Sequence, residues 1–149
     1  MITIELSTLK AGLLLFWSLW LTLVLVTNIF DGLKQLGVLP DWWRWVSGNF
    51  QAIAESVPLP RWVIGLLFLG VVLWEGLGVV LFWSAFYGYG VTGTAGLVQV
   101  YTAFAVSLAL WSAFMIADEV FRIYAYQGTH LLLFAGQLLT VLVIGLLPT

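Results

Sequence analysis

The chain has no cysteine and few charged residues for its 149-residue length. Without cysteine it can form no disulfide, bind no metal through thiolate and use no cysteine nucleophile. Only 8% of the residues are charged and 62% are hydrophobic, and the mean hydropathy of +1.09 exceeds that of soluble globular domains. Five basic residues against seven acidic ones give no basic patch, so we expect no nucleic-acid partner. The composition therefore predicts an integral membrane protein whose main contact is lipid.

The usual signatures of catalysis are also missing. The sequence contains no Walker loop, no HExxH and no GxSxG, so we expect no enzyme, and no motif names a cofactor. His130 is the one histidine. A haem or transition-metal site usually needs more than one such ligand, so we expect His130 to lie at the membrane interface instead.

Four apolar runs organise the chain, at residues 11–30, 62–86, 95–117 and 131–147. Each is near the roughly 20 residues that a helix needs to cross the hydrocarbon layer. A helix satisfies its backbone hydrogen bonds internally, as lipid requires, and no run shows the alternating polarity of a barrel strand. The sequence predicts an all-α polytopic membrane protein, one domain over residues 1–149 with four transmembrane helices. The first run ends in bulky residues, so we expect it to be retained.

The first connection, residues 31–61, holds most of the polar residues. Its middle contains the tryptophans Trp42, Trp43 and Trp45 around Arg44. Indole rings prefer the depth of the lipid headgroups, and a guanidinium reaches water from there. We therefore expect a partly helical segment within residues 41–56 that lies on the membrane.

The other connections bear on orientation. Residues 87–96 carry no charge and predict a tight hairpin between the second and third apolar helices. The first and third connections share one side of the membrane and carry most of the basic residues, namely Lys34, Arg44, Arg61 and Arg122. The positive-inside rule places that side in the cytoplasm.

The third connection begins with charged residues that could extend the third helix beyond the hydrocarbon. Asp118 precedes Arg122 by four residues and Glu119 precedes it by three. These spacings place the charges on one helical face, so we expect ion pairs there.

Glu75 stands in the middle of the second apolar run. A charged carboxylate at the bilayer centre is costly, so we expect Glu75 to face protein as a neutral acid that donates one hydrogen bond. No basic residue lies near the same depth, so its partners should be neutral. Polar residues near the middle of the other runs are Ser18, Thr22, Ser107, Gln137 and Thr140. Three roles fit this carboxyl group: a structural tether, a proton-relay or ligand-binding group, and a contact with another subunit.

Small residues mark places where helices can approach closely. Gly70, Gly76 and Gly78 flank the central glutamate of the second run. In the third run, alanine recurs every fourth residue at Ala105, Ala109, Ala113 and Ala117. Such stripes let membrane helices pack. We expect this stripe at a helix–helix contact, either within the chain or between chains.

Several short motifs resemble an uncharacterised bacterial family of predicted small integral membrane proteins with four helices. The shared features are Asn28 and Asp31 after the first helix, Glu75 within the second, and "FMIADEVFRIY", which contains Phe114, Met115, Glu119, Phe121 and Tyr124. This chain departs from the family in its uncharged second connection and in "IYAYQG" near the third. The resemblance implies a bacterial membrane protein of four helices, in the opposite orientation to the charge count, and implies no activity.

Two functions fit these observations. Small loops, absent catalytic motifs and a small-residue stripe favour a non-catalytic accessory or assembly subunit, bound to other membrane subunits in a bacterial inner or internal membrane. The alternative is a small carrier or proton-coupled ligand-binding protein centred on Glu75. Coupled transporters usually contain internal repeats or broken helices, and the sequence shows no repeat.

Overall fold

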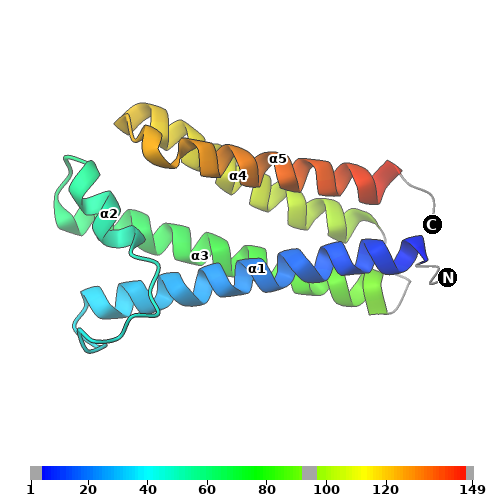
Figure 1. The fold of residues 1–149 in the computed structure, drawn as a ribbon, viewed down its shortest axis with the longest axis horizontal. Coiled ribbons are helices and arrows are strands. Elements are labelled where there is room, and N and C mark those ends of the chain that lie inside the picture. The colour runs from blue at the N-terminus through cyan, green and yellow to red at the C-terminus, as the bar shows by residue number, and fades with distance from the viewer. Residues whose placement is uncertain (1–4, 92–96, 147–149) are drawn as a thin grey trace.

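The computed structural model describes residues 5–91 and 97–146, and all of its regular structure is helical. The elements are α1 (Leu6–Gln35), α2 (Asn49–Ser56), α3 (Arg61–Ala85), the π-helix η1 (Phe86–Val91), α4 (Leu97–Phe121) and α5 (Tyr124–Leu146) (Figure 1). Four of them are long and apolar enough to cross a membrane: α1, α3 with its continuation to Gly90, α4 and α5. The predicted all-α membrane fold with four spans is confirmed.

The four long helices form two antiparallel pairs. α1 packs along α3, α4 packs along α5, and contacts between α3 and α4 join the pairs (Figure 1). α1 and α5 touch only slightly. η1 also rests on α1, because a Cβ atom at Gly90 would lie 3.1 Å from Cβ of Ala11. This close approach favours a residue without a side chain at position 90, where η1 packs against α1.

The packed core lies in the half of the bundle where α1 begins and α5 ends. Leu14, Leu21, Phe82, Phe104 and Ile144 are each at most 1% exposed there. The rings of Phe82 and Phe104 meet edge to face with centroids 4.9 Å apart. Close packing of this kind, rather than exclusion of water, holds helices together in lipid.

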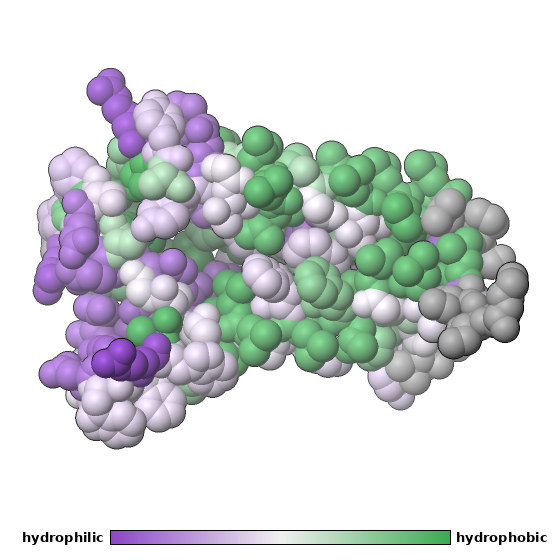
Figure 2. Space-filling model, in the orientation of Figure 1, coloured by the Kyte–Doolittle hydropathy of each residue, from purple (hydrophilic) through white to green (hydrophobic). Residues whose placement is uncertain are grey.

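At the other end the two pairs diverge, and polar residues gather on the surface (Figures 1 and 2). This end carries the connections from α1 to α3 and from α4 to α5. We call it the polar end.

Helix bounds differ from the apolar runs at both ends of α1, which begins at Leu6 rather than Ala11, and otherwise mainly near the polar end. α1 ends at Gln35 rather than Phe30, and α5 begins at Tyr124 rather than Leu131. Polar residues in these extensions find partners on neighbouring elements, so the helices continue past the hydrophobic boundary. α4 likewise continues to Phe121. The predicted helix start at residue 95, the predicted end at residue 147 and most of the second connection lie outside the described residues.

The turn between α4 and α5 overturns the predicted ion pairs of Arg122. Arg122 adopts a left-handed backbone conformation with φ of 58°, and the amide of Ile123 donates to the carbonyl of Asp118 over 2.8 Å. Because Arg122 has left the helix, the three- and four-residue spacings to Glu119 and Asp118 no longer place the charges together. Asp118 pairs with His130 of α5 instead.

The first connection confirms the predicted partly helical segment. α2 lies within the predicted range, and the tryptophans cluster around Phe30 at the end of α1. Ring centroids of Trp43 and Trp45 lie 5.6 Å and 5.5 Å from that of Phe30. The ring of Trp42 lies 5.9 Å from that of Trp43 at an angle of 56°, with its side chain largely exposed, so the three rings form one aromatic cluster on α1.

Candidate functional site

A buried amide–carboxyl contact joins α1 to α3 near the middle of the bundle. Nδ2 of Asn28 donates to both carboxyl oxygens of Glu75, over 2.8 Å to Oε1 and 2.9 Å to Oε2. Both residues are 2% exposed. Glu75 therefore faces protein, as expected, but it accepts hydrogen bonds here rather than donating one.

This contact continues into a polar network that reaches α2. Oδ1 of Asn28 accepts a hydrogen bond from Nδ2 of Asn49 over 2.9 Å. Asp31 lies nearly one turn further along α1, and its Oδ2 accepts from the Ser47 hydroxyl over 3.0 Å and from the Phe50 amide over 2.9 Å. A carboxylate at a helix N-terminus is favourable, because the first amides of the helix lack internal partners. Asp31 thus docks the start of α2 on α1.

The five polar residues expected opposite Glu75 do not reach it. Three hydroxyls bond to carbonyls of their own helix instead: Ser18 to Leu14, Thr22 to Ser18 and Thr140 to Gly136. Two of these hydroxyls also accept from indoles, Thr140 from Trp17 and Thr22 from Trp83. The hydroxyl of Ser107 and both amide atoms of Gln137 are buried without a partner in the part of the chain that the structure describes.

Helix register explains why a different residue meets Glu75. A Cβ atom at Gly78 would lie 3.6 Å from Leu21, so those residues are opposite one another, and Glu75 lies about one turn nearer the polar end. Asn28 lies about two turns from Leu21 on α1, and its side chain still meets Glu75 because in an antiparallel pair each of these side chains leans toward the N-terminus of its own helix and so toward the other. The apolar run ends at Phe30, which predicts that Asn28 lies at the edge of the membrane. In the structure α1 continues to Gln35, so Asn28 lies inside the helix.

A second polar pair connects α4 to α5 at the polar end. Nδ1 of His130 lies 2.6 Å from Oδ2 of Asp118, and the imidazole stacks near the rings of Phe114 and Trp111, with centroids 5.0 Å and 6.1 Å away. Asp118 is 5% exposed. A carboxylate at one ring nitrogen orients the imidazole and leaves Nε2 for other contacts.

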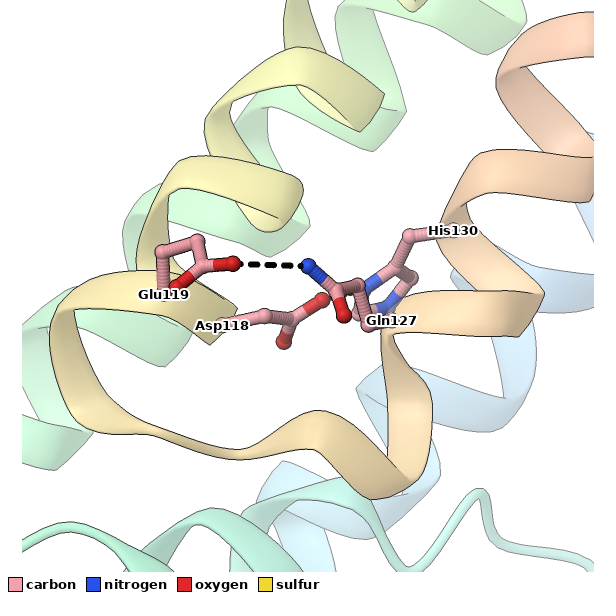
Figure 3. A network of polar contacts seen from close by, with 4 residues as sticks. All are labelled: Asp118, Glu119, Gln127 and His130. Atoms are coloured by element: carbon pink, nitrogen blue, oxygen red, sulfur yellow. Dashed lines mark hydrogen bonds and ion pairs between the residues drawn. The ribbon is translucent and has the colours of Figure 1, made fainter.

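Glu119 and Gln127 add a more exposed contact beside this pair, with Nε2 of Gln127 donating to Oε1 of Glu119 over 3.1 Å (Figure 3). Hydropathy predicts only that Asp118 and His130 lie at the membrane boundary. The tight turn at Arg122 brings them face to face, which no local sequence pattern indicates.

One cavity lies between the α1–α3 pair and the α4–α5 pair. Its volume is about 590 Å³, and the polar residues that line it include Asn28, Asn49, Glu75, Asp118 and His130, together with Tyr126 and Thr129. Trp20, Val71, Leu110 and Leu133 are among the apolar residues of its wall. Trp111 also lines it, and the buried Nε1 of that indole has no partner among residues 5–91 and 97–146. The size and the mainly apolar wall with few polar groups are typical of small-molecule sites.

The chemistry of this cavity is that of hydrogen bonding and proton exchange. It combines a carboxyl group, an imidazole and an indole N–H, and the first two are the side chains that most often transfer protons. Within the described residues no group of three His, Cys, Asp or Glu side chains is placed to hold a metal ion. Glu75, on α3, and His130, on α5, lie on walls from different helix pairs, so a ligand here could contact both.

The alanine stripe of α4 divides between the cavity and the outer surface. Ala105, Ala109 and Ala113 are exposed, while Ala113 and Ala117 line the cavity. The stripe therefore does not form a packed contact inside this chain, because α3 and α5 meet other faces of α4. A contact between chains stays a prediction. Among the glycines near Glu75, Gly70 lines the cavity and Gly78 packs on Leu21.

No family model, curated protein or solved structure matches this chain. The four long apolar helices are consistent with a small four-helix membrane protein, and no family is identified. The resemblance drawn from the motifs therefore stays a prediction. Three of its residues, Asn28, Asp31 and Glu75, nevertheless come together in one network.

Proposed function

We propose that this protein binds a small lipid-soluble ligand in the cavity between its two helix pairs, and acts as a carrier or proton-coupled binding protein. One observation carries the proposal: a single hollow of about 590 Å³ is lined by Glu75 from one helix pair and by the His130–Asp118 pair from the other. Ionisable residues within membrane spans usually mark substrate or proton paths. The proposal assigns no bond-making reaction to the chain.

The polar groups of the cavity suit a ligand whose head group donates hydrogen bonds. Each carboxyl oxygen of Glu75 can accept two hydrogen bonds. Asn28 donates one to each oxygen, so one acceptor position on each oxygen is left for a ligand. With its Nδ1 proton directed at Asp118, His130 presents Nε2 as an acceptor. A hydroxyl or ammonium head group with an apolar body would match these acceptors and the hydrophobic wall.

The test is native mass measurement of the protein extracted gently from its own membranes, with Ala113→Phe as the blocking variant. Ala113 lines the cavity and its side chain takes no part in the polar contacts, so a phenylalanine there would occupy ligand space. Ala109→Phe is the matched control, because Ala109 is exposed one turn earlier and does not line the cavity. We expect wild type and Ala109→Phe to carry a bound small molecule and Ala113→Phe to lose it. Equal retention in both variants, or no bound molecule in wild type, would overturn the proposal.

A second candidate function is that of an accessory or assembly subunit in a bacterial inner or internal membrane. The exposed Ala105 and Ala109 favour it, because they offer a flat surface on which another membrane helix could pack. Copurification separates the two candidates. A stable complex with other membrane proteins and an empty cavity would favour the subunit, whereas an isolated chain with a bound small molecule would favour the carrier.

A further inference from the structure

A groove separate from the cavity runs along the outside of the α1–α3 pair at the polar end. Its volume is about 640 Å³, and it lies where the last turns of α1 face the first turns of α3. The aliphatic residues of its wall are Ile29, Leu33, Leu36, Leu66, Leu69 and Val72. A Cβ atom at Gly65 would meet nothing within 4 Å, so this glycine leaves open space in the groove wall. Asn28 and Phe68 line both the groove and the cavity and separate the two.

The mouth of this groove is polar and carries positive charge. Arg61 begins α3 and Gln35 ends α1, both are exposed, and both line the groove. No acidic residue is among the described residues that line it. Arg61 also forms no ion pair with any residue in the described ranges 5–91 and 97–146. By contrast, Lys34 nearby donates to the backbone carbonyls of Asp41 and Trp43.

The position of the groove relative to the membrane boundary indicates which kind of molecule fits it. Arg61 lies at the start of a membrane span, next to Trp62, whose ring is 69% exposed and also lines the groove. Arginine and tryptophan at a span boundary stand at the level of lipid headgroups. An apolar groove that begins there and runs toward the membrane centre has the polarity of a phospholipid with its headgroup at Arg61 and one acyl chain along Leu66 and Leu69.

We propose that this groove binds one anionic glycerophospholipid, with the phosphate at Arg61 and Gln35. A guanidinium binds phosphate oxygens through paired N–H donors, and an amide adds a neutral donor. A zwitterionic lipid places a positive choline beside the same guanidinium and binds less well. The site is independent of the cavity ligand, because the two spaces open on different faces of the α1–α3 pair.

The experiment compares retention of phosphatidylglycerol and phosphatidylcholine on the protein by native mass measurement after exchange into mixed micelles of each lipid. We expect wild type to prefer phosphatidylglycerol and Arg61→Gln to lose about fivefold of that preference, the ratio that corresponds to about 1 kcal/mol for one basic residue at a membrane surface. Arg44→Gln is the matched control, because it removes the same charge from the same connection outside the groove. It should keep the preference.

Two further measurements keep the result decisive. Gly65→Leu fills the open space beside the acyl chain, so it should weaken retention of both lipids while its helix content stays that of wild type. Inorganic phosphate added in excess should not displace the lipid, because the acyl chain contributes to binding. Equal lipid preference in wild type and Arg61→Gln would overturn the site, as would an equal loss in Arg44→Gln. Displacement by phosphate would show a simple anion site instead.

Discussion

Buried polar side chains in this protein fall into two groups that mutation should separate. Asn28 supplies both hydrogen bonds that Glu75 accepts from protein, whereas Gln137 is fully buried and has no partner in the described ranges. Removing a partner from a buried polar group leaves that group desolvated without compensation, but removing an unpaired group relieves such a cost. The two substitutions should therefore change stability in opposite directions.

Asn28→Leu should lower the free energy of unfolding by about 1–3 kcal/mol, because Glu75 would stay buried without its donor. Unfolding of the detergent-solubilised protein by denaturant, followed by circular dichroism, measures the change. Thr27→Ala is the control, since the Thr27 hydroxyl bonds only to carbonyls of its own helix and its loss should change stability by less. Equal losses in the two variants would show that the Asn28–Glu75 contact contributes little.

Gln137→Leu should leave stability unchanged or raise it by about 1 kcal/mol, because leucine has similar volume and no polar atoms to bury. The same unfolding measurement applies. A clear loss of stability would mean that the Gln137 amide makes a favourable contact, and the assignment of this residue as unpaired would be wrong.

At the level of elements, α2 depends on Asp31. This helix has only eight residues and no buried side chain, so its own packing is weak. Helices this short are marginal without external contacts. The carboxylate of Asp31, bonded to Ser47 and the Phe50 amide, supplies such a contact, and Asn49 adds a bond to Asn28.

Asp31→Ala should release the start of α2 while the four long helices persist. Hydrogen exchange at the Phe50 amide should accelerate by at least tenfold, because loss of a charge-assisted bond costs about 1.5–3 kcal/mol. Ser56→Ala is the control within the same helix, since its hydroxyl bonds only to the Ala52 carbonyl. Unchanged exchange at Phe50 would show that other contacts hold α2 in place.

For the molecule as a whole, substitutions on the two faces of α4 should separate effects on folding from effects on association. Ala103 is fully buried in the core, and Ala109 is exposed on the outer surface. Leucine at a packed position forces neighbouring side chains apart, whereas leucine on a lipid-facing surface meets only mobile acyl chains.

Ala103→Leu should therefore lower the unfolding free energy of the isolated chain by about 1–3 kcal/mol. Ala109→Leu should leave that value unchanged and weaken only association with another chain or subunit, measured by crosslinking in native membranes. If Ala109→Leu also destabilised the isolated chain, the alanine stripe would be an internal contact after all.

Membrane orientation is a further property of the whole molecule. Lys34, Arg44, Arg61 and Arg122 all lie on the polar-end connections or at the helix ends that border them, so the positive-inside rule places this end in the cytoplasm. The chain has no cysteine, so a single introduced cysteine is the one thiol of the chain that a maleimide can label. An impermeant maleimide added to intact cells should label Glu5→Cys, because Glu5 is exposed just outside the first span at the end opposite the polar end, and should leave Gln51→Cys unlabelled. The reverse pattern would support the orientation implied by the family resemblance.

The membrane class, the four spans and the helical segment between the first two can all be predicted from the sequence alone. These follow from hydropathy summed over about twenty neighbouring residues, which is a local property that tertiary contacts do not change. The sequence also predicts that Glu75 faces protein, because lipid penalises a carboxyl group whatever its partner. Hydropathy does not set the helix ends, since polar residues such as Gln127 remain helical once α4 offers them a partner.

Which polar groups meet depends on tertiary contacts. The partner of Glu75 depends on the register between α1 and α3, which is set by contacts at Gly78 and Gly90 and not by hydropathy. The pairing of Asp118 with His130 depends on the left-handed turn at Arg122. The cavity exists because the two helix pairs pack closely at one end and diverge at the other, and such a geometry arises from contacts between distant segments that no local pattern records.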